Sequence, residues 1–190
     1  TNANCKNVVR LISTGGVDVK DARSYPKVEY LILEYADNGD VFGALKQNDK
    51  KMEWKLRSLH QLFKGVQQIH RLSIAHQDLK PTNIVVSKEL LSDLNISKET
   101  TKLSDFGSAI NIFTNRDELP RHLKKSIAGT WQYAPPELLY NEVFHDTVSG
   151  RIACDLYLLG SMVVYYFTKR SMTSMIKENL ADYLSWTIND

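Results

Sequence analysis

Cysteine is scarce in this sequence. The 190 residues contain two, Cys5 and Cys154, which are far apart and belong to no Cys-x-x-Cys pair or Cys/His cluster. This spacing suggests neither a disulfide framework nor a zinc site, and it favours a reducing, cytoplasmic setting.

An excess of charge of either sign is also missing. Lys and Arg total 24 against 22 Asp and Glu, which gives a net charge of +2. We therefore expect neither nucleic acid nor a membrane surface as a partner, and the oligomeric state stays open.

No apolar run is long enough to cross a bilayer. The most apolar stretch, Ala153 to Phe167, is shorter than the roughly 20 residues required, and it carries Asp155 and Gly160. This pattern predicts a buried helix. The sequence opens on Thr1 rather than Met, so we expect a truncated start, and its opening residues lack the apolar core of a signal peptide. With 43% hydrophobic residues, the chain can bury one substantial core.

The most informative stretch is the polar loop at 75–83, between apolar segments. It contains an acid (Asp78), a cation (Lys80) and a carboxamide (Asn83), and Pro81 disfavours helix there. Asp78 could accept a proton from a hydroxyl, Lys80 could neutralise a phosphoryl oxygen, and Asn83 could ligate a divalent cation. These roles belong together in phosphoryl transfer.

A second polar motif, Asp105-Phe106-Gly107, follows an expected strand at 101–104. Mg²⁺ prefers hard oxygen ligands and is usually held by one or two protein groups, so Asp105 and Asn83 form a minimal set. Phe106 is expected to pack inward, and Gly107 to supply a permissive backbone.

The remaining pattern predicts a mixture of strands and helices. Strands are expected at 7–12, closed by Gly15 and Gly16, at 27–33 and at 84–86. An amphipathic helix is expected at 54–72, and a helix opening at Asp155. The polar stretch 87–100 resembles an inserted loop, and a further helix is indicated near 183–186.

These motifs resemble the catalytic domain of a eukaryotic-type protein kinase: His76-x-Asp78 with Asn83, then Asp105-Phe106-Gly107, then the segment from Gly129-Thr130 to Glu137. With Lys80 after Asp78-Leu79, the loop resembles that of the serine/threonine kinases rather than that of the tyrosine kinases. The implied fold is α+β and kinase-like. Residues 1–33 would be a remnant of the small-lobe sheet, residues 34–40 the hinge, and residues 41–190 a mainly helical large lobe that is truncated at its C-terminal end.

The resemblance also implies ATP and Mg²⁺ as cofactors and a protein as substrate. The catalytic residues would be Asp78, Lys80, Asn83 and Thr130, with Asn83 and Asp105 on the metal. The nucleotide would contact Leu33, Glu34, Ala36, Asp40, Val85 and Asp105. The Thr130 hydroxyl would bridge Asp78 and Lys80, Glu137 would make a structural ion pair, and Asp155 would accept hydrogen bonds from the loop backbone.

The sequence departs from the kinase pattern at Gln77, where most such kinases carry arginine. That arginine pairs with a phosphorylated activation segment, here expected at 108–128 with Thr114 and Ser126 as acceptors, so we expect no dependence on that phosphorylation. The Gly-rich loop and the ATP-anchoring lysine of the family have no counterpart in the chain, so the fragment alone is expected to be inactive. The alternative is a pseudokinase-type binding or scaffold module.

Overall fold

A computed structural model of the chain describes residues 5–18, 27–47, 50–91, 96–114, 130–136 and 147–180. The elements in order are β1 (Leu11–Asp18), β2 (Lys27–Leu33), α1 (Val41–Gln47), α2 (Met52–Arg71), β3 (Ile74–Ala75), a 3-10 turn (Pro81–Asn83), β4 (Ile84–Leu91), β5 (Ile96–Leu103), β6 (Ile110–Asn111), α5 (Val148–Thr168) and α6 (Met172–Leu180). Within these described ranges, three antiparallel two-stranded sheets, β1–β2, β3–β6 and β4–β5, accompany the helices. This is the α+β content that the sequence predicts.

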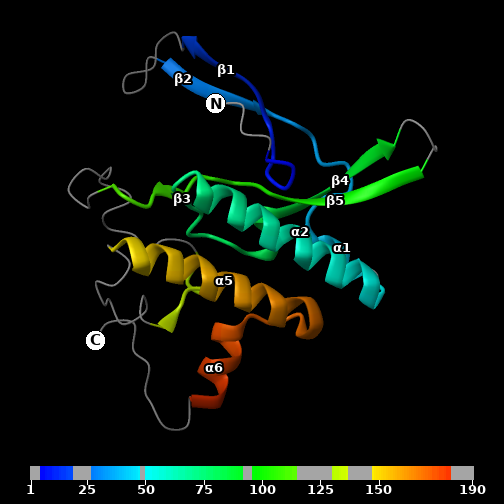
Figure 1. Cartoon of the computed structure of the whole chain (residues 1–190), viewed down its shortest axis with the longest axis vertical. Helices are drawn as coiled ribbons and strands as arrows, with labels where there is room; N and C mark the ends of the chain where they lie inside the picture. The colour runs from blue at the N-terminus through cyan, green and yellow to red at the C-terminus, as the bar shows by residue number, and fades with distance from the viewer. Residues whose placement is uncertain are drawn as a thin grey trace.

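The β1–β2 hairpin lies at one end of the molecule and α6 at the other, with α2 and α5 between them (Figure 1). The β4–β5 hairpin packs closely on α2. The side chains of β2 are exposed along its whole length, and those of β1 nearly so. The packed core therefore excludes the β1–β2 hairpin, and it is formed mainly by the helices together with Ile84, Val86 and Leu103 of β4 and β5.

The amphipathic helix predicted at 54–72 is confirmed as α2. Its buried apolar stripe is Leu59, Leu62, Val66 and Ile69. Burying a side chain of this size stabilises the fold by about 1.5–3 kcal/mol. Gly65 has a steric reason to be in the stripe: a Cβ there would lie 2.7 Å from the backbone oxygen of Asn7. The chain before β1 therefore crosses directly over α2.

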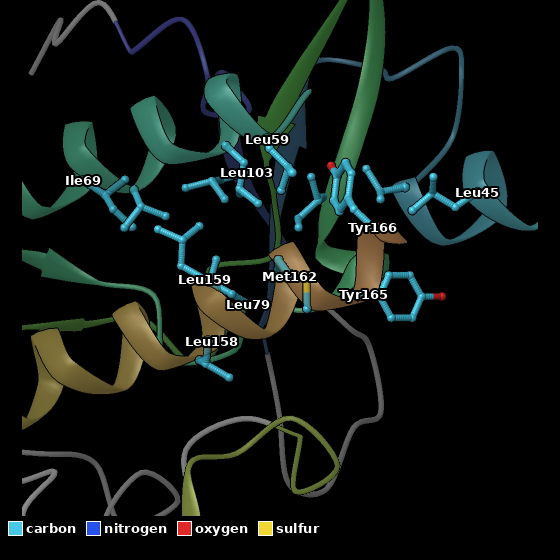
Figure 2. Packing of buried hydrophobic residues seen from close by; sticks show 14 of the residues in the cluster. Leu45, Leu59, Ile69, Leu79, Leu103, Leu158, Leu159, Met162, Tyr165 and Tyr166 are labelled. Atoms are coloured by element: carbon cyan, nitrogen blue, oxygen red, sulfur yellow. The ribbon is translucent and has the colours of Figure 1, made fainter. Parts of the chain in front are cut away.

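The apolar helix α5 packs against α2 and supplies the other half of the core (Figure 2). Leu158, Leu159, Met162 and Tyr166 are at most 4% exposed. α5 is 21 residues long and by length and composition could cross a membrane, so the expectation that no stretch is long enough, based on the shorter run 153–167, is wrong. Half of its most apolar window is buried inside the fold, which agrees with the predicted buried helix.

The predicted start of α5 is wrong by about two turns. The helix begins at Val148, because the Thr147 side chain caps it by accepting a hydrogen bond of 2.9 Å from the backbone N–H of Gly150. Asp155 therefore lies well inside the helix, where its side chain is fully buried.

A chain of hydroxyl groups ties three elements together inside the core. Ser58 on α2 lies 2.7 Å from the Thr101 hydroxyl on β5 and 2.7 Å from the Tyr166 hydroxyl on α5. Burial raises the pKa of Tyr166, and its hydrogen bond to Ser58 opposes the shift. The three hydroxyls satisfy one another where water is excluded.

Two strand predictions need correction. The strand expected at 7–12 runs instead over Leu11–Asp18, through the two glycines, because the Tyr30 and Lys27 side chains of β2 lie across Gly15 and Gly16 where a Cβ would be. The inserted loop expected at 87–100 is mostly strand: β4 and β5 pair continuously from Ile84↔Leu103 to Leu91↔Ile96. The strand at 27–33 is confirmed.

Candidate active site

The polar loop that follows β3 is held by buried residues on each side. Ala75 precedes it, Leu79 lies within it and Ile84 follows the 3-10 turn, and all three are 0% exposed. Strand β3 pairs with β6, so the loop leaves the core beside the residues that follow Asp105. Buried apolar residues before, within and after the loop thus fix the backbone that carries its polar side chains.

Asp155 ties this loop to α5, as predicted. Its Oδ2 accepts a hydrogen bond of 2.8 Å from the backbone N–H of His76, and its Oδ1 accepts one of 2.8 Å from the backbone N–H of Gln77. Gln77 has a φ of 66°, a left-handed conformation that costs a non-glycine residue free energy. The buried carboxylate holds the loop in this conformation.

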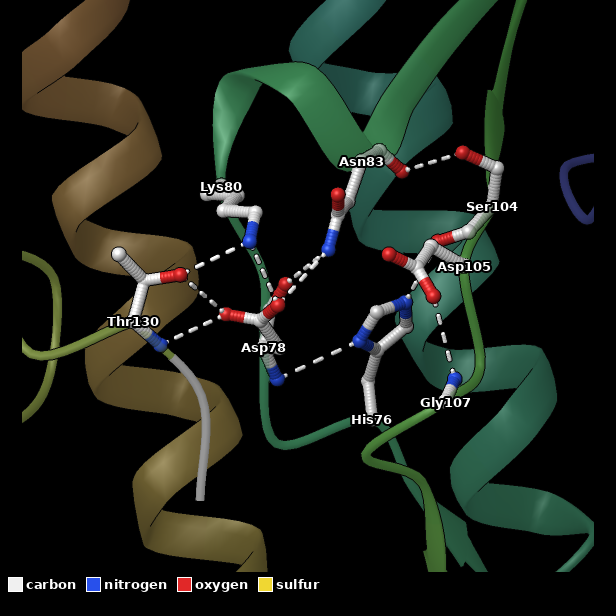
Figure 3. A network of polar contacts seen from close by, with 8 residues as sticks. All are labelled: His76, Asp78, Lys80, Asn83, Ser104, Asp105, Gly107 and Thr130. Carbon is white, nitrogen blue, oxygen red and sulfur yellow. Dashed lines mark hydrogen bonds and ion pairs between the residues drawn. The ribbon is translucent and has the colours of Figure 1, made fainter. Parts of the chain in front are cut away.

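Asp78 is the centre of the site (Figure 3). Its Oδ1 accepts hydrogen bonds from the Thr130 backbone N–H (2.8 Å) and hydroxyl (3.0 Å), and its Oδ2 accepts from Lys80 Nζ (2.8 Å) and Asn83 Nδ2 (3.0 Å). Lys80 Nζ also donates to the Thr130 hydroxyl at 2.8 Å. The bridge expected from Thr130 is therefore present, and all four predicted catalytic residues are in direct contact.

His76 links the Asp78 loop to the Asp105 strand. Its Nε2 lies 3.0 Å from the Ser104 carbonyl and its Nδ1 lies 3.4 Å from the backbone N–H of Asp78. A neutral ring with a proton on Nε2 satisfies both groups, whereas a charged ring has no acceptor for Asp78. Burial lowers the pKa of His76, more strongly than Asp155 and the other nearby groups raise it.

The two predicted metal ligands lie on adjacent backbone segments. Ser104, directly before Asp105, donates from its backbone N–H (2.9 Å) and its hydroxyl (3.0 Å) to the Asn83 carbonyl. The Asn83 side-chain bonds to Asp78 both use Nδ2, so the oxygen Oδ1 takes no part in them. Asp105 is exposed. One amide oxygen and one open carboxylate suit Mg²⁺, which usually completes its shell with phosphate and water.

The predicted role of Gly107 is corrected. The left-handed residue is Asp105 itself, with a φ of 59°, and Gly107 is outside the positive-φ region. A Cβ on Gly107 would instead lie 3.2 Å from Asp105 Oδ1, which accepts the Gly107 N–H at 3.3 Å. Phe106 packs inward as predicted, with its ring centroid 4.9 Å from that of His76.

The predicted nucleotide residues fall into two groups. Asp40 forms a β-bridge with Val85, and the backbone N–H of Val86 donates to the Gly39 carbonyl at 2.8 Å, so the end of the 34–40 segment lies on β4. Asp40 Oδ1 also caps α1, accepting from the Gly43 N–H at 2.7 Å.

Leu33, Glu34 and Ala36 lie towards the β1–β2 hairpin. Leu33 is 45% exposed, and the Ala36 carbonyl accepts from the Gly39 N–H at 3.3 Å. Within the described residues, no hydrogen bond joins these three residues to Asp78, Lys80, Asn83 or Thr130. The Glu34 backbone N–H donates to the Arg10 carbonyl at 3.0 Å, so the adenine contact predicted for Glu34 would have to use its carbonyl.

Sequence reasoning missed two contacts beside the site. Lys102 Nζ lies 3.0 Å from both carboxylate oxygens of Glu34, which joins β5 to the end of β2. His70 on α2 places its Nε2 2.8 Å from Asp155 Oδ2. Neither pairing has a local sequence signal, because the partners are 68 and 85 residues apart.

Some predictions lie outside the described residues. These are Ser126, Gly129, Glu137 and the helix expected near 183–186, together with most of the expected activation segment.

The chain matches the family model "Protein kinase domain" over residues 1–185. The probable serine/threonine-protein kinase HSL1 of Saccharomyces cerevisiae is 32% identical over 132 residues, covering 69% of this chain and 8% of its own length. The serine/threonine-protein kinase grp of Drosophila melanogaster is 29% identical over 169 residues, covering 88% of this chain and 30% of its own length.

A solved structure of a kinase is also similar to this chain. The crystal structure of the yeast RNA Pol II CTD kinase CTDK-1 complex contains a similar chain, with a TM-score of 0.62 and 25% identity, covering 88% of this chain and 46% of the other. The chain spans less than a third of the length of the curated relatives named here. The kinase-like fold predicted from the motifs is confirmed, and the chain belongs to the protein kinase domain family.

Proposed function

We propose that this chain forms part of a serine/threonine kinase catalytic domain that transfers the γ-phosphoryl group of ATP, with Mg²⁺, to a hydroxyl of a protein substrate. The observation that carries the proposal is the Asp78 carboxylate, held on both oxygens by Lys80, Asn83 and Thr130. A carboxylate beside a lysine and a carboxamide can serve a hydroxyl nucleophile and a phosphoryl group in one place.

In this role, Asp78 orients the substrate hydroxyl and accepts its proton. Each Asp78 oxygen already accepts two hydrogen bonds, which is about the acceptor capacity of a carboxylate. The incoming hydroxyl must therefore displace a donor. We expect it to displace the Thr130 hydroxyl, because the charge-assisted bond from Lys80 is the stronger one.

Bound ATP with Mg²⁺ supplies the phosphoryl group and neutralises its charge. We assign the metal to Asn83 Oδ1 and the Asp105 carboxylate. We assign the adenine to the segment 34–40 over Val85, and the ribose to Asp40 Oδ2, since Oδ1 caps α1. Lys80 then stabilises charge on the transferred group.

The test is Mg²⁺-dependent ATP binding and phosphorylation by the protein that contains this domain, compared with Asp105→Asn and with Asp18→Asn. Asp18 is an exposed aspartate at the end of β1, so its variant controls for loss of one charge. We expect Asp105→Asn to lose Mg²⁺-dependent ATP binding and phosphate transfer, and Asp18→Asn to keep both.

A folded wild-type protein that binds no ATP would overturn the proposal. In that case the polar cluster around Asp78 would be structural, and the scaffold interpretation of the sequence would replace the enzymatic one.

A further inference from the structure

A buried arginine on α5 has no part in the site described above. Arg151 lies one helical turn before Asp155, and it is 1% exposed. A charged side chain is rarely buried to this degree unless its hydrogen bonds are supplied by the protein. The position of its partners therefore indicates what the residue does.

The Arg151 guanidinium binds backbone carbonyl groups near the start of the segment that separates Asp105 from Thr130. Its Nη1 donates to the carbonyl oxygens of Asn111 (3.1 Å), Ile112 (3.0 Å) and Thr114 (2.6 Å). These three contacts use carbonyl groups, so they do not depend on which side chains the segment carries.

The same stretch is also held by the residues that lead into the loop with Asp78. Asn111 pairs with Ile74 across β6 and β3, and the Ile112 N–H donates to the Ser73 carbonyl at 2.9 Å. Ile112 is 6% exposed.

Arg151 also touches the catalytic loop through its own backbone. Its carbonyl oxygen accepts a hydrogen bond of 2.9 Å from Gln77 Nε2, and Gln77 is 1% exposed. One residue of α5 thus contacts both the loop with Asp78 and the segment that leads away from Asp105. Gln77 is neutral, so the side chain at this position offers no charge to a phosphate.

We propose that Arg151 is a positioning residue that holds the start of the Asp105–Thr130 segment through its backbone carbonyls and keeps it in register with the catalytic loop without any phosphate. The proposal rests on the proposed function for its catalytic consequence. Its structural part, the anchoring of residues 111–114, stands independently of phosphate transfer.

The structural part is tested by amide hydrogen exchange of the wild type, Arg151→Met, Arg151→Lys and Arg57→Met. Arg57 is an exposed arginine on α2, so its variant is the matched control. We expect the Ile112 and Thr114 amides to exchange at least about tenfold faster in Arg151→Met, relative to amides in the α2 core. Lysine should restore part of the protection, because its ammonium group can still donate to carbonyls.

The comparison with α2 separates positioning from general loss of stability. A merely structural arginine would, when replaced, speed exchange in α2 and in residues 111–114 alike, and that outcome would overturn the proposal. Unchanged exchange at Ile112 and Thr114 in Arg151→Met would overturn it as well. If Arg151→Met does not fold, the test is made on Arg151→Lys. Partial loss of protection at the Ile112 and Thr114 amides relative to α2 supports the proposal, and unchanged exchange at these two amides overturns it.

The catalytic part is tested on the same proteins by kinetics with a peptide substrate, before and after phosphatase treatment. We expect Arg151→Met to lower kcat about 10–100-fold, with the ATP dissociation constant within about twofold of wild type. Phosphatase should change neither wild-type activity nor exchange at Ile112 and Thr114. An effect of phosphatase on either would refute phosphate independence, whereas inactivity of the untreated wild type would refute the proposed function and leave the exchange result standing.

Discussion

Replacing Asp155 with asparagine tests how the polar loop at 75–83 is held to α5. Asp155 is 0% exposed, and its carboxylate accepts the backbone N–H groups of His76 and Gln77, each at 2.8 Å. Asparagine has the same shape, but its NH₂ group replaces one acceptor. If the NH₂ takes the Oδ2 place it faces the His76 N–H, and if it takes the Oδ1 place it faces the Gln77 N–H. One buried backbone donor loses its acceptor in either orientation.

The expected loss of stability follows from these bonds. A buried donor without a partner costs about 1–3 kcal/mol, and the bonds that remain lose the benefit of the carboxylate charge. The total is about 3–4 kcal/mol, a large part of the 5–15 kcal/mol typical of a folded domain. For a chain of this size the melting temperature should fall by roughly 10 °C.

Urea unfolding followed by tryptophan fluorescence measures the change. The slope against urea should stay the same for Asp155→Asn while the midpoint falls. The exposed control Asp18→Asn should stay within about 0.5 kcal/mol of wild type. A loss below about 1 kcal/mol for Asp155→Asn would refute the view that the buried carboxylate holds the loop.

Three further perturbations test neighbouring parts of the site. Because burial lowers the pKa of His76 from 6.5 in the folded state, the unfolded chain takes up a proton that the folded chain does not. The free energy of unfolding should therefore fall as pH drops below about 6.5, by up to ~1.4 kcal/mol per pH unit, and a pH series of urea titrations should show a flatter dependence for His76→Gln. Lys102→Met leaves the Glu34 carboxylate without its cation, and it should lower the free energy of unfolding by about 2–3 kcal/mol in the same assay. The control is Lys98→Met, an exposed position on the same strand, which should lower it by under about 0.5 kcal/mol. Equal losses of stability in the two variants would contradict the role of the Lys102–Glu34 pair. Asp78→Asn should lower the phosphorylation rate about 10²–10⁴-fold with ATP affinity unchanged by calorimetry, and a change in ATP affinity alone would exclude Asp78 as the base.

Local pattern was enough to predict several parts of this protein. The apolar stripe of α2 recurs at helical spacing, so the helix could be predicted to within two residues at its start and one at its end. The loop with Asp78, Lys80 and Asn83 could be predicted as a polar site between buried segments, because its residue types and its proline lie within nine residues of sequence. Each of these signals depends on neighbours along the chain.

Other features were decided only by tertiary packing. The polar stretch after Val86 has no strand pattern, yet it forms β4 and β5 because each strand provides the hydrogen bonds of the other. Gly65 is required by the backbone that passes over it near Asn7, whereas the space at Gly15 is taken by the end of the Tyr30 side chain across the hairpin.

The polar contacts around the site show the same division. The bonds of Asp155 to the loop were predicted from the resemblance to protein kinases and not from the local pattern around it. Arg151 is also a charged residue in an apolar helix, and that is a signal that it has partners, but the helix pattern does not say which. Its bonds to the carbonyls of residues 111–114 arise because the fold brings together segments 37 to 40 residues apart. The sequence determined which polar side chains form the candidate site, and the tertiary structure decided which backbone groups hold them in place, since backbone groups are alike in every residue and only their position in the fold distinguishes them.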